Sequence, residues 1–205
     1  MKKKLLALIA SVLTVAMIIP AAACNRSSGN TEENTALFYQ EADYSDRNGQ
    51  KREWNNVSSY FCNYGVFQEE MLKYDVAILS ENIGAEGLQK LQDAGVWTVC
   101  YISFGEDNPL RTGDGMGPGG FSSYYLYDDE DKPIPNGDWG SYYTDPGSPA
   151  WREFLYNEIQ RIVDMGFDGI FIDTVDSVDR FPETFNDMCD LIRSVDEKWP
   201  DIKMV

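Results

Sequence analysis

The sequence predicts an α/β fold of the (β/α)8 TIM-barrel class. Short apolar runs alternate with amphipathic segments about four times, and no hairpin signal separates them. This order is typical of a parallel sheet wrapped by helices, either a barrel or a doubly wound sheet. No GxGxxG motif opens a helix, which argues against a nucleotide-binding fold.

The central strand of the prediction lies in residues 166–176, which read GFDGIFIDTVD. An apolar run bounded by glycine and polar residues is typical of a buried strand. Because side chains alternate along a strand, Ile170 and Ile172 share one face, and Phe171 and Asp173 share the other. Asp173 therefore stands where the strand ends. Carboxylates are seldom placed in buried strands without pairing or function.

Three further strands precede this one, over residues 57–64, 75–79 and 96–104, all rich in β-branched and aromatic residues. Residues 65–73 and 84–94 between them have helical patterns. The latter ends at a glycine, a common helix stop.

Residues 149–165 form the strongest predicted helix, with Pro149 in its first turn and an apolar stripe facing the core. Residues 181–198 form another, and a fifth strand begins at 201–205. The inward positions of the latter helix are expected to be Phe185, Met188, Leu191, Ile192 and Val195.

Residues 107–145 read as a long loop rich in Gly, Pro, Asp and Tyr. Loops of this length are usually functional or disordered, and its aromatic content favours an ordered loop that faces a ligand. A closed barrel needs about eight strands. We therefore expect residues 53–205 to be the N-terminal part of a barrel that is cut short after about strand five.

The N-terminus has the pattern of an export signal. Residues 1–23 combine three lysines, an apolar segment and small residues before Cys24, which resembles a bacterial lipobox. We expect lipidation at Cys24 and a polar tether over 24–52, which would place the protein on the extracellular side of the cell membrane. The alternative is an ordinary signal cut near Ala23.

Composition narrows the possible partners and chemistry. The formal net charge is -17, so nucleic acid and anionic membrane surfaces would be repelled. The absence of histidine excludes Ser-His-Asp and Cys-His mechanisms and His-ligated zinc. Acid–base work must therefore be done by carboxylates, Tyr, Lys or Cys. We expect a monomer with no cofactor.

Three cysteines follow Cys24, namely Cys62, Cys100 and Cys189, at spacings that fit no metal template. Buried free thiols are expected. A Cys62–Cys100 disulfide is the alternative that an exported protein permits.

Polar residues that could carry chemistry gather at the predicted strand ends, where parallel α/β folds place their active sites. Carboxylate pairs lined with aromatic rings suit glycoside hydrolysis, in which one carboxylate engages the anomeric carbon and another protonates the leaving oxygen. The structural alternative is that Glu106 and Asp176 cap helices or pair with Arg111 and Arg180. Candidate catalytic residues are Asp173 and Glu106; candidate substrate-binding residues are Tyr64, Asp75, Tyr101, Trp139, Tyr143, Asp145 and Asp176. Asp168, at the strand entry, is expected to be structural.

Three stretches resemble the TIM-barrel domain of glycoside hydrolase family 114. They are YISFGE at 101–106, YYTD with the following PAW at 142–151, and GFDGIFIDTVD at 166–176. The resemblance covers roughly residues 60–205. That family includes endo-α-1,4-polygalactosaminidases, so the resemblance implies hydrolysis of a galactosamine-rich polysaccharide.

The resemblance also implies roles for individual residues. By position, Asp173 matches the catalytic aspartate of the family, as nucleophile, and Tyr101 and Asp176 match motif positions near the sugar. The acid/base glutamate of the family falls on a later strand, beyond Val205. The sequence thus predicts a lipid-anchored extracellular glycosidase. A non-catalytic carbohydrate-binding lipoprotein and a metal-dependent hydrolase that uses Asp173, Asp176 and Glu106 are the alternatives.

Overall fold

The computed structural model describes residues 49–205. The predicted signal segment 1–23, the lipidation site Cys24 and all but the last residues of the 24–52 tether lie outside the described residues.

A parallel sheet forms the centre of the structure. Its five strands follow the order β1 (Tyr60–Asn63), β2 (Val76–Leu79), β3 (Trp97–Ser103), β7 (Gly169–Asp173) and β8 (Lys203–Met204). Each neighbouring pair is parallel, as βα repeats require. The sheet is not closed, and β1 and β8 are its two edges. This order confirms the predicted TIM-barrel class.

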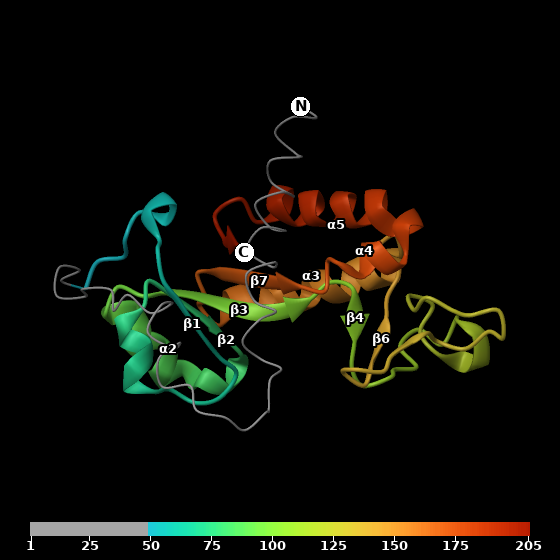
Figure 1. Cartoon of the computed structure of the whole chain (residues 1–205), viewed down its shortest axis with the longest axis horizontal. Helices are drawn as coiled ribbons and strands as arrows, with labels where there is room; N and C mark the ends of the chain where they lie inside the picture. The colour runs from blue at the N-terminus through green and yellow to red at the C-terminus, as the bar shows by residue number, and fades with distance from the viewer. Residues whose placement is uncertain (1–48) are drawn as a thin grey trace, which may run out of the picture.

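Helices connect successive strands of this sheet (Figure 1). The turn η3 (Glu69–Lys73) precedes β2, and η4 (Glu81–Ile83) with α2 (Gly84–Asp93) precedes β3. Helix α3 (Pro149–Asp164) leads into β7. Between β7 and β8 lie α4 (Ser177–Arg180), η6 (Pro182–Thr184) and α5 (Phe185–Lys198). A short turn, η2 (Trp54–Asn56), opens the described region.

The core divides between the two faces of the sheet. Ile170 and Ile172 pack in the large cluster that also contains the buried stripes of α2, α3 and α5. Val76, Ile78 and Val99 form a smaller cluster on the other face, with Phe171 packed against it. The predicted alternation of Ile170 and Ile172 against Phe171 is therefore confirmed, and Asp173 lies on the side of Phe171.

A second, antiparallel sheet was not predicted. Strands β4 (Glu106–Asp107), β6 (Ser141–Tyr143) and β5 (Pro135–Asn136) pair in this order, and β5 and β6 form a hairpin. The prediction of a loop without hairpins is wrong here, because strands of two or three residues are too short to show alternation. We call residues 107–145 the arm; it extends from the end of the sheet at which β3 and β7 finish (Figure 1).

Two predictions of burial are wrong. Phe185 is among the exposed large side chains, because it begins α5 instead of lying within its apolar stripe. Cys62 is exposed, whereas Cys100 and Cys189 are buried, and all three are free thiols. A Cys62–Cys100 bridge is unreachable because β2 lies between the strands that carry them, at about 4.8 Å per strand.

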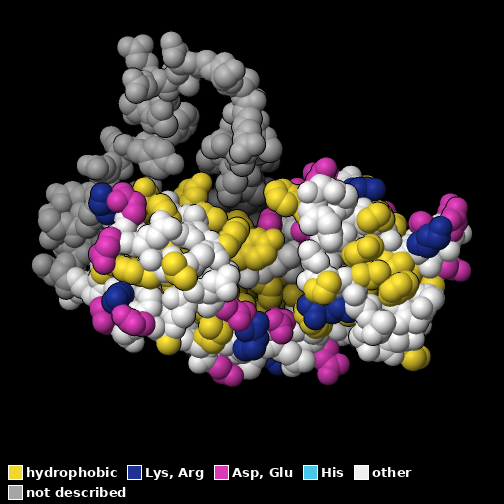
Figure 2. All heavy atoms as spheres, turned by 90° about the horizontal axis from the view of Figure 1, so that it is seen from below, with side chains coloured by type: hydrophobic (Ala, Val, Ile, Leu, Met, Phe, Trp, Pro, Cys, Tyr) yellow, Lys and Arg dark blue, Asp and Glu magenta, His cyan; other side chains and the backbone are white. Residues whose placement is uncertain are grey.

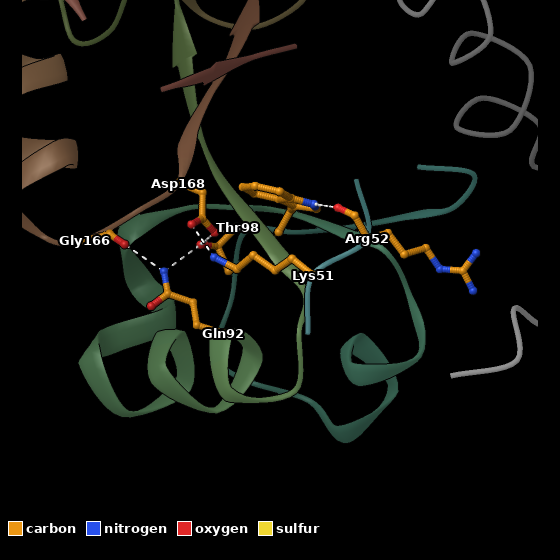
Figure 3. Close-up of polar contacts among 7 residues, drawn as sticks. Lys51, Arg52, Gln92, Thr98, Gly166 and Asp168 are labelled. Atoms are coloured by element: carbon orange, nitrogen blue, oxygen red, sulfur yellow. Dashed lines mark hydrogen bonds and ion pairs between the residues drawn. The ribbon is translucent and has the colours of Figure 1, made fainter. Parts of the chain in front are cut away.

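Asp168 holds the entry end of the sheet together, as Figure 3 shows. Its carboxylate accepts hydrogen bonds from the backbone and hydroxyl of Thr98, both at 2.9 Å, and contacts the ammonium of Lys51. Gln92 bridges the hydroxyl of Thr98 and the carbonyl of Gly166. The prediction of a structural Asp168 agrees with this network.

Asp75 also lies at the entry end, not at the end that carries Asp173. Its side chain is 1% exposed, and one oxygen accepts four hydrogen bonds from the backbones and hydroxyls of Ser58 and Ser59. Arg52 Nε lies 2.9 Å from the other oxygen, in a charge contact that is not aligned as a hydrogen bond. The prediction that Asp75 binds substrate is therefore corrected: its carboxylate secures the segment that precedes β1.

The pKa of Asp75 yields the first prediction. Burial acts to raise it, but the hydrogen bonds from Ser58 and Ser59 and the charge of Arg52 outweigh burial and hold it below its usual value. The ionised form is thus preferred by the folded protein, so its stabilisation is present above about pH 4 and is lost as pH falls through the depressed pKa. We expect Asp75→Asn to cost about 3 kcal/mol at pH 7 and less at pH 3.

Urea unfolding of both proteins at the two pH values measures this difference. Asp129→Asn, at an exposed aspartate of the arm, is the matched control and should change little. An equal cost at pH 7 and pH 3 would contradict the assignment.

Candidate active site

Asp173 is the last residue of β7 and faces the same side of the sheet as Phe171. Its register partner on β3 is Ser103, so the two strands end together. The hydroxyl of Tyr101, two residues earlier on β3, donates a 2.9 Å hydrogen bond to Asp173 Oδ2. A donor fixed on a neighbouring strand restrains the carboxylate at the carboxyl edge of the sheet, the usual place for catalytic groups in this architecture.

Tyr101 stands between two other rings on this face. The ring centre of Tyr64, directly after β1, lies 5.1 Å away at a steep angle, and that of Phe171 lies 6.3 Å away. Burial, followed by the charge of Asp173, raises the pKa of Tyr101. Burial, followed by the hydrogen bond with Cys62, raises that of Tyr64. Both phenols therefore stay protonated at neutral pH, and Tyr101 remains a donor to Asp173.

Glu106 lies on β4, directly before the arm, on the side of the site that the arm forms. Its Oε2 accepts hydrogen bonds from Ser141 Oγ at 2.6 Å and Asn136 Nδ2 at 2.8 Å, at the two ends of the β5–β6 hairpin turn. Pairing with Arg111 does not occur, because Arg111 binds the next residue, Asp107. Glu106 therefore fastens the hairpin to the end of β3, whatever else it does.

Asp107 is the residue that sequence reasoning missed. It is buried and accepts hydrogen bonds from the hydroxyls of Tyr124 and Tyr125, at 2.8 and 3.1 Å, and from Arg111 Nε at 2.9 Å. Tyr124 in turn packs against Trp151 of α3 at 5.0 Å. The pair of adjacent tyrosines and the acidic pair at 106–107 were the available signals. This network attaches the arm to the core and so determines where Glu106 stands.

Asp176 follows β7 by three residues, at the start of α4. It makes no side-chain capping bond, contrary to the structural alternative. Its pKa is raised by partial burial first, and then by the charges of Asp173, Asp179 and Glu106. Asp173 and Glu106 thus lie close enough to Asp176 for their charges to oppose its ionisation.

The remaining predicted residues lie around this group. Tyr143 pairs with Glu106 across β4 and β6, and the guanidinium of Arg180 lies over its ring at 5.0 Å. Asp145 accepts a 2.8 Å hydrogen bond from the backbone of Gly147, before α3. Trp139, in the turn of the β5–β6 hairpin, is 76% exposed. Figure 2 shows hydrophobic side chains gathered at the end of the molecule that the arm forms.

Two further observations concern residues 49–205 as a whole. This part of the chain has no group of three or more Cys, Asp and Glu side chains arranged to hold a metal ion, so the metal-dependent alternative gains no support from the geometry. No helix within it is long and apolar enough to cross a membrane.

Comparison with known proteins defines the class. Over 72% of its length the chain superposes on the glycoside hydrolase domain of PelA from Pseudomonas aeruginosa, with a TM-score of 0.57 and 20% identity, and it covers 58% of that domain. It also superposes on Aspergillus fumigatus Ega3 in complex with galactosamine, with a TM-score of 0.52 and 17% identity, over 74% of this chain and 61% of that one. These similarities show a shared fold.

The family follows from the sequence. The model of glycoside-hydrolase family GH114 matches residues 68–198, and the chain belongs to this family. An uncharacterized protein of Methanocaldococcus jannaschii is 26% identical over 106 residues, which is 48% of this chain. One of Deinococcus radiodurans is 30% identical over 87 residues, which is 42% of this chain. The chain spans about a quarter of the length of these relatives, 27% and 26% respectively.

The raised pKa of Asp176 yields the second prediction. The folded protein holds this proton more tightly than the unfolded chain does, so the ionised form destabilises the fold at neutral pH. We expect Asp176→Asn to raise the melting temperature at pH 7. The gain should vanish below about pH 4, where an ordinary aspartate is protonated in both states.

Calorimetry between pH 7 and pH 3 checks this, again with Asp129→Asn as the control. A lower melting temperature for Asp176→Asn at pH 7 would contradict a raised pKa for Asp176.

Proposed function

We propose that the protein is a glycoside hydrolase that cleaves a galactosamine-containing polysaccharide, with Asp173 acting at the anomeric carbon. The observation that carries the proposal is the hydrogen bond from Tyr101 to Asp173 at the carboxyl edge of the sheet, in a chain of family GH114. A carboxylate held at one oxygen keeps the direction that attack on a sugar carbon requires. The galactosamine bound to Ega3 supports the choice of sugar.

Glu106 is the proton donor that we propose within this chain. It lies on β4, shortly after β3 ends, and its charge adds to burial and to the charge of Asp173 in raising the pKa of Asp176. A glycosidase of either stereochemical course needs two carboxyl groups across the scissile bond. The alternative partner is a glutamate from residues outside this chain, in which case Glu106 serves only to fasten the β5–β6 hairpin.

We expect Asp173→Asn in the full-length protein to abolish release of reducing ends from α-1,4-linked galactosamine polymer while the fold stays intact. The amide cannot act as nucleophile, and losses of at least about 1,000-fold follow from removal of such a group. Reducing-end assays and circular dichroism measure the two properties, with Asp129→Asn as the matched control. Activity like that of the parent in Asp173→Asn would overturn the proposal.

Glu106→Gln in the same assay separates the two possible proton donors. A loss of about 100-fold or more supports Glu106 as the acid, since general acid catalysis typically contributes this much. Activity above about a tenth of the parent value assigns the acid to another residue. If the parent binds the polymer and releases no reducing ends, the non-catalytic carbohydrate-binding alternative is favoured.

The exposed ring of Trp139 is proposed to stack on a sugar beyond the scissile bond. Indole faces bind apolar sugar faces, and the hairpin that carries Trp139 is joined to Glu106 through Asn136 and Ser141. We expect Trp139→Ala to raise KM about 10-fold, or about 1.4 kcal/mol, with little change in kcat. Trp139→Phe, which keeps an aromatic face, is the matched control. A fall in kcat without a change in KM would contradict this role.

We also propose export and a lipid anchor at Cys24. The support is the sequence alone: lysines, an apolar segment and small residues precede Cys24, and a polar stretch follows it.

A further inference from the structure

Thr174, directly after Asp173, has an unusual backbone conformation. Its φ angle is +61°, in the left-handed region, which side chains branched at Cβ rarely adopt. Asp131, in the arm, is the other non-glycine residue with positive φ in the described part of the chain. Such conformations persist only where the surrounding structure imposes them, and they cluster at functional sites.

Contacts from β3 hold Thr174 in this conformation. The backbone N–H of Phe104 donates to the carbonyl of Asp173 at 3.0 Å, so the pairing of β3 and β7 continues past the strand ends. The hydroxyl of Ser103 donates to Thr174 Oγ1, also at 3.0 Å. The carbonyl of Thr174 then accepts from the backbone of Ser177 at 3.3 Å, which closes the turn before α4.

Gly105 fits against this turn only because it has no side chain. A Cβ atom there would lie 2.2 Å from the carbonyl oxygen of Thr174 and 2.5 Å from Ser177 Oγ, both far inside contact distance. Gly105 does not have positive φ, so space and not backbone freedom requires glycine here. On its other side, the carbonyl of Gly105 accepts a 3.0 Å hydrogen bond from Thr144 of the arm.

From these contacts we infer that Ser103, Gly105 and Thr174 are positioning residues that set the relative placement of Asp173 and Glu106. Asp173 is bonded covalently to Thr174, and Glu106 to Gly105, so the packing of Gly105 on Thr174 fixes both carboxylates at once. Displacement of a catalytic group by about 1 Å can cost on the order of 100-fold in rate. The inference rests on the proposed glycosidase function.

Variants at Thr174 distinguish positioning from a structural role. Thr174→Gly removes the strain at positive φ and the hydrogen bond from Ser103 together, so we expect a melting temperature within about 2 °C of the parent. It should nevertheless lower kcat about 10-fold or more on α-1,4-linked galactosamine polymer, with KM unchanged. Thr174→Asn should restore most of the activity, because asparagine tolerates the left-handed region and keeps an acceptor for Ser103.

Gly105→Ala should lower kcat about 100-fold, because the new methyl group must push the turn away. Crystal structures of Thr174→Gly and Gly105→Ala provide a readout that does not depend on the substrate. In Gly105→Ala, we expect the 2.9 Å hydrogen bond between Tyr101 and Asp173 to lengthen beyond hydrogen-bond distance. In Thr174→Gly, we expect the Asp173 side chain to adopt alternative conformers.

Full activity in Thr174→Gly, or an unmoved Asp173 in both crystal structures, would overturn the inference. If the parent releases no sugar, the proposed function fails, and the two crystal structures alone then decide whether these residues position Asp173.

Discussion

The parallel pairing of β3 with β7 is the constraint on which the rest of the structure depends. Its register places Ser103 beside Asp173 and Tyr101 beside Phe171. Because the pairing continues to Phe104, the chain that leaves β3 runs directly against the chain that leaves β7. The Tyr101 hydrogen bond, the close approach of Gly105 and the start of the arm all follow from this register. A slip by one residue would turn Asp173 to the helix-covered face.

Aspartates lie in different surroundings at the two ends of the sheet. At the entry end, Asp75 and Asp168 accept hydrogen bonds from serine and threonine residues and lie against Arg52 and Lys51, and the pKa of Asp75 is held below its usual value. At the carboxyl end, partial burial and then the charges of Asp173, Asp179 and Glu106 raise the pKa of Asp176. Carboxylates paired with hydrogen-bond donors and cations stabilise a fold, whereas carboxylates that repel one another are found at sites where they have a chemical function. The opposite directions of the two pKa shifts, below the usual value for Asp75 and above it for Asp176, agree with a structural role at the entry end and a candidate site at the carboxyl end.

Sequence reasoning predicted the long elements of the fold and the position of Asp173. The alternation in residues 166–176 predicted the face of the strand on which Asp173 lies, because Ile170 and Ile172 are buried on the face that the helices cover. The arm was not predictable in this way, since β4 and β5 have two residues each and are held by the side-chain hydrogen bonds of Glu106 and Asp107. Asp75 stands at the entry to its strand, and the prediction that it binds substrate is wrong because the carboxyl ends of the strands, not their entries, form the candidate site. The strained Thr174 leaves no mark in composition or periodicity.

A crystal structure of the full-length Asp173→Asn protein with an α-1,4-linked galactosamine oligosaccharide is the most direct test of the central claim. We predict a sugar ring against Tyr64 and Tyr101, with its anomeric carbon within about 3.5 Å of the residue-173 side chain. The oxygen of the scissile bond should face the proton donor, which is either Glu106 or a glutamate outside this chain. A sugar bound at another face, with residue 173 out of reach, would contradict the claim that this edge of the sheet is the active site.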